Sequence, residues 1–120
     1  PEAFPTGHEG GDHVRDDYEG QGFGDGGVIT TAADLAAFYH ALRDGRLLAD
    51  PWLDMMLADP VGEGYGMGIE VEGDIVGHSG GDLGFASEVR MDVTNGDIAI
   101  VLVGEADGDT DFAWDRLDAR

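Results

Sequence analysis

The sequence predicts an α+β fold in which an antiparallel β-sheet is flanked by helices. Two segments, within residues 31–45 and 50–60, repeat apolar side chains at helical spacing. From residue 65 onward apolar and polar residues alternate, as in strands that cover one face. Asn95-Gly96 is a strong signal for a tight hairpin between two of these strands. A helical pattern returns within residues 110–120.

Residues 1–27 form a glycine-rich acidic segment with little periodicity, which predicts a loop. A loop of this length in a compact domain usually lines a site. His8 and His13 lie among carboxylates here, and in a glycine-rich loop we interpret such a cluster as solvated charge rather than a metal site. The division we predict is therefore a loop segment, 1–27, followed by a helix-sheet-helix portion, 28–120.

The helices have recognisable ends. Thr31 is a side-chain N-cap with Asp34 three residues later, and Gly45 supplies the stop. For the second helix we expect Asp50 as the cap and Pro51 in the first turn, with Pro60 ending the segment.

The strands follow from the period of two. We expect one strand from Tyr65, a tight turn at Gly73-Asp74, and a short strand ending near His78 before a glycine-rich bend. Val89, Met91 and Val93 then alternate with polar residues. Asn95-Gly96 predicts a type I′ turn with positive φ at both positions. The continuously apolar run 98–103 should be covered on both faces.

The charge is strongly acidic, with 26 acidic residues against six arginines, no lysine and a formal net charge of −20. Such a surface repels nucleic acid and anionic membranes, and no apolar run is long enough to span a membrane. Because the acids are spread over every segment, we interpret them as adaptation to high salt rather than as an acidic tail. At about 1 M salt the Debye length falls to about 3 Å, which screens the self-repulsion. This interpretation implies a hypersaline environment and fits a cytoplasmic and an extracellular location equally.

The most informative motif runs from Gly77 to Val93, with His78-Ser79-Gly80-Gly81 at its start. Two glycines after a polar pair let a ligand approach the backbone closely. Together with the helix start Gly26-Gly27-Val28-Ile29-Thr30-Thr31-Ala32-Ala33-Asp34-Leu35, this motif resembles the C-terminal part of the serine β-lactamase and D-alanyl-D-alanine peptidase superfamily, in its class C-like esterase and peptidase branch. The resemblance implies a partial β-lactamase/transpeptidase-like fold.

The resemblance also implies roles for individual residues. His78-Ser79-Gly80 corresponds to the third catalytic motif of the superfamily. Gly81 N–H would be an oxyanion donor, Ser79 would hydrogen-bond a substrate carboxylate or carbonyl, and His78 would take part in proton traffic. Gly80 would let substrate lie along the strand edge. The nucleophilic Ser-x-x-Lys motif is absent, since the chain has no lysine, and no Tyr-x-Asn occurs.

We therefore interpret the chain as the C-terminal part of a halophilic serine hydrolase that acts on β-lactams, D-Ala peptides or esters. Alone it should be inactive. Its expected partners are the N-terminal portion of the parent fold and a second copy in a homodimer. No cofactor is indicated beyond loosely bound Na⁺, K⁺, Mg²⁺ or Ca²⁺ ions. The alternative is a stand-alone binding or structural module adapted to salt, with cation binding as one variant.

Overall fold

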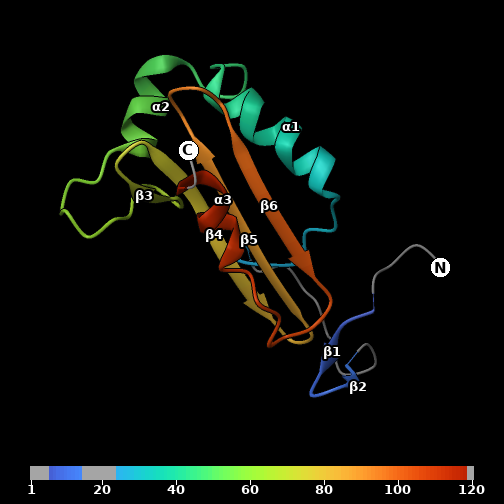
Figure 1. Ribbon diagram of the computed structural model, residues 1–120. Helices are drawn as coiled ribbons and strands as arrows, with labels where there is room; N and C mark the ends of the chain where they lie inside the picture. Colours follow the sequence, from blue (N-terminus) through green and yellow to red (C-terminus); the bar gives the residue numbers. More distant parts are fainter. Residues whose placement is uncertain (1–5, 15–23, 119–120) are drawn as a thin grey trace.

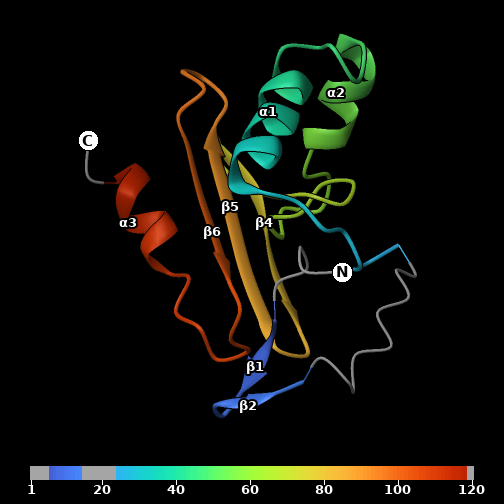
Figure 2. The ribbon, with the colours of Figure 1, turned by 90° about the vertical axis from the view of Figure 1, so that its right-hand side faces the viewer.

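The computed structural model describes residues 6–14 and 24–118. Within these residues the main sheet has four antiparallel strands in the order β3-β4-β5-β6, namely β3 (Glu70–Glu72), β4 (Ile75–Asp82), β5 (Phe85–Asp92) and β6 (Ile98–Val103). The helices are α1 (Ala32–Arg43), α2 (Asp50–Leu57) and α3 (Phe112–Asp118). Helices α1 and α2 lie on one face of the sheet and α3 on the other (Figures 1 and 2). The predicted α+β fold is confirmed.

Helix α1 begins where the capping signal predicted. The Thr31 side chain accepts a hydrogen bond from the Asp34 N–H at 3.1 Å. This bond satisfies one of the amide groups that a helix start leaves without a partner. Helix α2 differs slightly from the prediction, because Ala49 is its N-cap and Asp50 is already helical.

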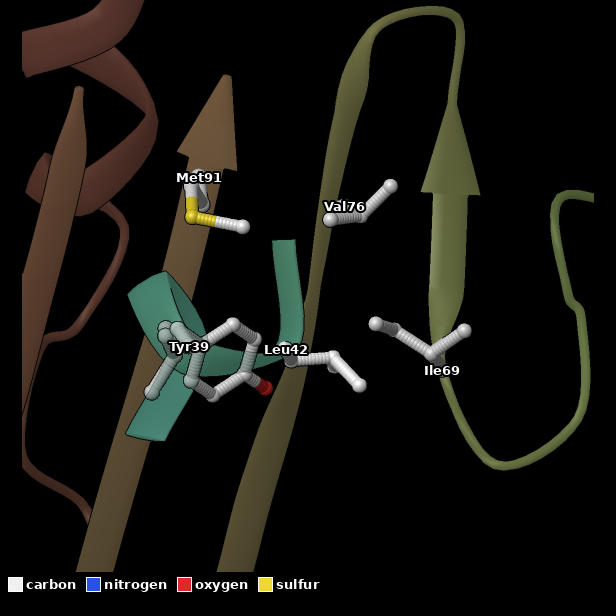
Figure 3. Packing of buried hydrophobic residues seen from close by; sticks show 6 residues of the cluster. Tyr39, Leu42, Ile69, Val76 and Met91 are labelled. Carbon is white, nitrogen blue, oxygen red and sulfur yellow. The ribbon is translucent and has the colours of Figure 1, made fainter. Parts of the chain in front are cut away.

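The hydrophobic core lies between the sheet and α1. Tyr39 and Leu42 project from α1 toward side chains of the sheet and of the turn before β3, as Figure 3 shows. Ile69 and Met91 are the largest fully buried side chains, at 2% and 1% exposure. This packing fixes the face of each strand, because side chains alternate between the two faces along a strand.

Two predicted strand boundaries are wrong. Regular pairing starts at Glu70 rather than Tyr65, because Gly64 and Gly68 adopt positive φ and only an isolated bridge joins Tyr65 to Glu70. At the other end, β4 does not stop near His78 but continues to Asp82, opposite Phe85 on β5. The bend predicted at the glycines is a continuous strand.

The hairpin at Asn95-Gly96 exists, but its turn type is not the predicted one. Of the two turn residues, Gly96 has positive φ, at 84°, and Asn95 does not. A type I′ turn needs positive φ at both. The loop is longer than two residues and is closed by the Asp92 N–H donating to the Asp97 carbonyl at 2.9 Å. The Asp92 carboxylate accepts hydrogen bonds from the Thr94 N–H and from the Asn95 side chain. These bonds stabilise the longer loop in place of the two-residue turn.

The described part of the segment predicted as loop contains a small hairpin, β1 (His8–Glu9) and β2 (Asp12–His13). Its turn uses Gly10 and Gly11, both with positive φ. The His8 N–H donates to the Gly84 carbonyl at 3.1 Å and the Gly104 carbonyl at 3.0 Å, so the hairpin is attached to the far end of the main sheet. Phe4, Tyr18 and Phe23, the aromatics of this segment, lie outside the described residues.

Strand β6 contacts α1 on one face and α3 on the other, so helices lie on both faces as predicted. Coverage is incomplete, since Leu102 is 43% exposed. In α3, Ala113 is completely buried while Phe112 is about half exposed, at 49%. Among the helices of the described residues, none is long and apolar enough to cross a membrane.

Candidate functional site: the open edge of strand β4

The four predicted site residues lie together in the second half of β4, and all four are exposed. Strand β3 is so short that it pairs only with Ile75, Val76 and Gly77. From His78 to Asp82, β4 pairs with β5 on one side, and no described strand pairs with its other side. This half of β4 is therefore an open strand edge, a place where an extended ligand can add its own hydrogen bonds.

The backbone orientation of this edge follows from one hydrogen bond. The Ser79 N–H donates to Oε1 of Glu70 at 3.2 Å, toward the β3 side. Backbone N–H groups of alternate residues in a strand point to the same edge. The Gly81 N–H therefore points to the open edge as well, where no described strand pairs with β4. On the face of the sheet, a Cβ at Gly81 would meet no atom within 4 Å, so nothing crowds this residue from above. A backbone donor at an open strand edge is suited to an incoming oxygen atom.

His78 is held by the loop that precedes β3. Its Nε2 lies 2.8 Å from the Tyr65 hydroxyl, and the two rings meet edge to face at 5.7 Å. Its Nδ1 forms a short contact with the Ser79 carbonyl and lies 3.7 Å from Glu70 Oε1. Both ring nitrogens are therefore engaged, which fixes the ring at the edge of β4.

Glu70 is a member of this site that the sequence did not reveal. Its Oε1 accepts hydrogen bonds from both the N–H and the hydroxyl of Ser79, at 3.2 and 3.0 Å, and its Oε2 accepts a short hydrogen bond from Arg90. Partial burial raises the pKa of Glu70, but the Ser79 hydrogen bonds and the Arg90 charge outweigh burial, so this pKa lies below its usual value. The Glu70 side chain is therefore held in its ionised, carboxylate form.

Arg90 supports Glu70 from inside the sheet. It is only 4% exposed, and its guanidinium forms a short ion pair with Glu88, which is 5% exposed. The guanidinium carbon lies 4.4 Å from the centre of the Trp114 ring, on α3. Burial raises the pKa of Glu88, and Arg90 offsets part of that rise. Glu70 is therefore paired with a buried arginine whose other side is covered by the Trp114 ring.

The sequence contained only a partial signal for this network. The alternation of Val89, Met91 and Val93 with polar residues placed Glu88 and Arg90 together on the other face of a strand. That face is buried, and the cover is Trp114 together with the ion pairs. Trp114 comes from α3, behind the sheet, and no local pattern in the sequence links it to Arg90.

No metal centre is present among the described residues, where no group of three or more His, Asp or Glu side chains is placed to hold an ion. His8 and His13 do face each other across the β1-β2 hairpin, with ring centres 4.5 Å apart. Asp16 and Asp17, the carboxylates closest to this pair on its C-terminal side, lie outside the described residues.

Comparison with known proteins finds one family model and one solved structure that this chain resembles. The sequence model of the Beta-lactamase family matches residues 2–119. A penicillin binding protein from Bacillus halodurans has a similar solved structure, with a TM-score of 0.60 at 23% sequence identity. The match covers 75% of this chain and 30% of that one, so the chain spans less than a third of that protein's length. A search of curated proteins gives no match.

Proposed function

We propose, from the premise that this chain belongs to the β-lactamase family, that it supplies the sheet side of a serine acyl-transfer site. In this proposal residues 28–120 are the helix-sheet-helix portion of the site-bearing domain, and residues 1–27 are a separate glycine-rich acidic segment. The substrate is a β-lactam, a D-Ala peptide or an ester, and the reaction passes through a covalent acyl-serine.

The observation that carries the proposal is the direction of the Gly81 N–H, toward the open edge of β4 that no described strand covers. Acyl transfer builds negative charge on the carbonyl oxygen, and fixed backbone N–H donors stabilise that charge. Gly81 would give one such donor. His78, fixed by Tyr65, would move or polarise a proton, and Ser79 and Gly80 would form the wall along which substrate lies.

The nucleophile belongs to a part of the protein other than these 120 residues, since no lysine is available for a Ser-x-x-Lys motif. That part would dock against the open edge of β4. The sequence upstream of Pro1 in the gene tests this directly. A reading frame that contains Ser-x-x-Lys supports the proposal, whereas a start codon next to Pro1 favours the stand-alone module.

A kinetic test uses the chain itself. We expect the isolated chain to hydrolyse neither nitrocefin nor p-nitrophenyl esters above background, because no activated nucleophile remains. Mass spectrometry after incubation should show the unmodified chain. Burst kinetics with an acyl adduct on Ser79 or Ser87 would overturn the assignment of the nucleophile to another part of the protein.

The proposal includes a high-salt habitat. Its support is the net charge of −20 with no lysine, spread over helices, strands and loops alike. Molar salt screens this repulsion. The measurement that tests it is the salt dependence of the thermal unfolding midpoint.

A further inference from the structure

The donors of Ser79 converge on one carboxylate oxygen that belongs to the chain itself. Glu70 Oε1 accepts from the Ser79 hydroxyl at 3.0 Å and from the Ser79 N–H at 3.2 Å. His78 Nδ1 stands 3.7 Å from the same oxygen. A hydroxyl and a backbone amide that donate to one oxygen, with an imidazole close by, are what a protein uses to bind an anionic oxygen atom. At this edge of β4 such a site exists, and Glu70 fills it.

Glu70 is fixed in that position from behind. Its second oxygen is paired with Arg90, which is 4% exposed and therefore has little freedom to follow Glu70 toward solvent. Trp114 and Glu88 hold the guanidinium in turn. Glu70 itself is about a third exposed, at 31% of its side chain, so it stands at the surface where a ligand would meet it.

We propose that Glu70 is an internal substitute for a ligand carboxylate, so that this site accepts neutral acyl groups and excludes ligands that place a carboxylate at Ser79. This inference rests on the proposed acyl-transfer function and names its substrate class, which is esters or amides without a carboxylate beside the reacting carbonyl. The Gly81 donor serves such substrates, because Glu70 does not contact it.

The exclusion has two physical causes. A ligand carboxylate at Ser79 would lack both Ser79 donors, which Glu70 already occupies, and an anionic oxygen without donors is costly to desolvate. It would also stand within a few ångströms of the Glu70 charge. Glu63 and Glu72 line the same hollow of about 370 Å³ beside Glu70, which adds to the negative potential. A neutral ester meets neither cost.

The test compares two ligands that differ in charge and by one methyl group, N-acetylalanine and its methyl ester. Binding is followed on the 120-residue chain in molar KCl by the NMR shifts of the Ser79 and Gly81 amides. We expect the unaltered chain to bind the ester more tightly than the acid. Glu70→Ala empties the site and should tighten binding of the acid about tenfold or more, with shifts at the Ser79 amide, while ester affinity changes by less than about twofold.

Glu72→Ala is the matched control, since it removes the same charge from the same strand at an exposed position. Because the Ser79 donors bind Glu70 and not Glu72, this variant should lower the preference for the ester by less than about twofold, far less than Glu70→Ala does. Glu70→Gln keeps a side chain of equal size and should tighten binding of the acid as well, which guards against a folding defect in the alanine variant. Equal binding of the acid by the unaltered chain and both Glu70 variants would overturn the inference. This readout is binding rather than turnover, so its failure is separate from failure of the acyl-transfer proposal.

Discussion

Arg90 holds a buried positive charge between two carboxylates, Glu88 on its own strand and Glu70 on β3. Removing one member of a buried charge network leaves its partner desolvated and unpaired, which costs more than the network itself contributes. At this residue the stability of the sheet and the position of the candidate site depend on the same guanidinium.

The prediction for Arg90→Met is a loss of about 3–5 kcal/mol in the free energy of unfolding, measured with urea in molar KCl. The cause is Glu88, which stays 5% exposed without its counter-charge. Arg46→Met is the control, because Arg46 has a side chain 62% exposed and should change stability by less than about 1 kcal/mol.

A double variant separates charge from packing. Glu88→Leu combined with Arg90→Met removes both buried charges and should recover most of the stability that the single variant loses. A double variant as unstable as Arg90→Met alone would show that Trp114 stacking, rather than the unpaired carboxylate, is the main contribution.

Two glycines of strand β4, Gly77 and Gly81, have different surroundings and therefore different structural roles. Gly77 is a packing residue, since a Cβ there would lie 1.8 Å from the Val89 carbonyl oxygen. Gly81 faces open space, with nothing within 4 Å of its Cβ position. Neither glycine has positive φ, so the difference between them is space and not backbone conformation.

Two alanine substitutions test this difference. Gly77→Ala should destabilise the protein by about 1–3 kcal/mol or more, because β4 must move away from β5. Gly81→Ala should change the free energy of unfolding by no more than about 0.5 kcal/mol. Thermal or urea unfolding of both variants in the same salt is the measurement, and similar midpoints would contradict the close approach of β4 to β5 at Gly77.

Charge dominates the behaviour of the whole molecule. With a net charge of −20 on 120 residues, the compact state repels itself in dilute buffer more than the expanded chain does. We predict that the thermal midpoint rises steeply between dilute buffer and molar KCl or NaCl, as the Debye length shortens to about 3 Å at 1 M. Circular dichroism across that range measures it, and a flat midpoint would contradict the salt adaptation.

The open surfaces of the molecule predict self-association once salt screens the charge. Trp52 and Met55 on α2 are 62% and 48% exposed, and the second half of β4 has an open edge. Exposed apolar side chains and open strand edges both favour contact with another chain. We expect a two-fold dimer by light scattering in molar salt at micromolar concentration, and a monomer mass would contradict it.

Local interactions let the sequence determine several elements. The Thr31 cap and the turn at Gly73-Asp74 each depend on residues only a few positions apart, and the structure confirms them. For the same reason the α+β class followed from the order of helical and alternating segments. The positions His78 to Gly81 came from a resemblance, and their roles stay a prediction.

Only the tertiary structure decided what surrounds those positions. Glu70 meets Ser79 nine residues away and Arg90 twenty residues away because three strands align in one register, and Trp114 reaches Arg90 from a helix behind the sheet. The extension of β4 to Asp82 is likewise set by pairing with β5, which overrides the preference of Gly80-Gly81 for a bend. Contacts of this kind depend on packing between distant segments, and a single sequence carries no local signal for them.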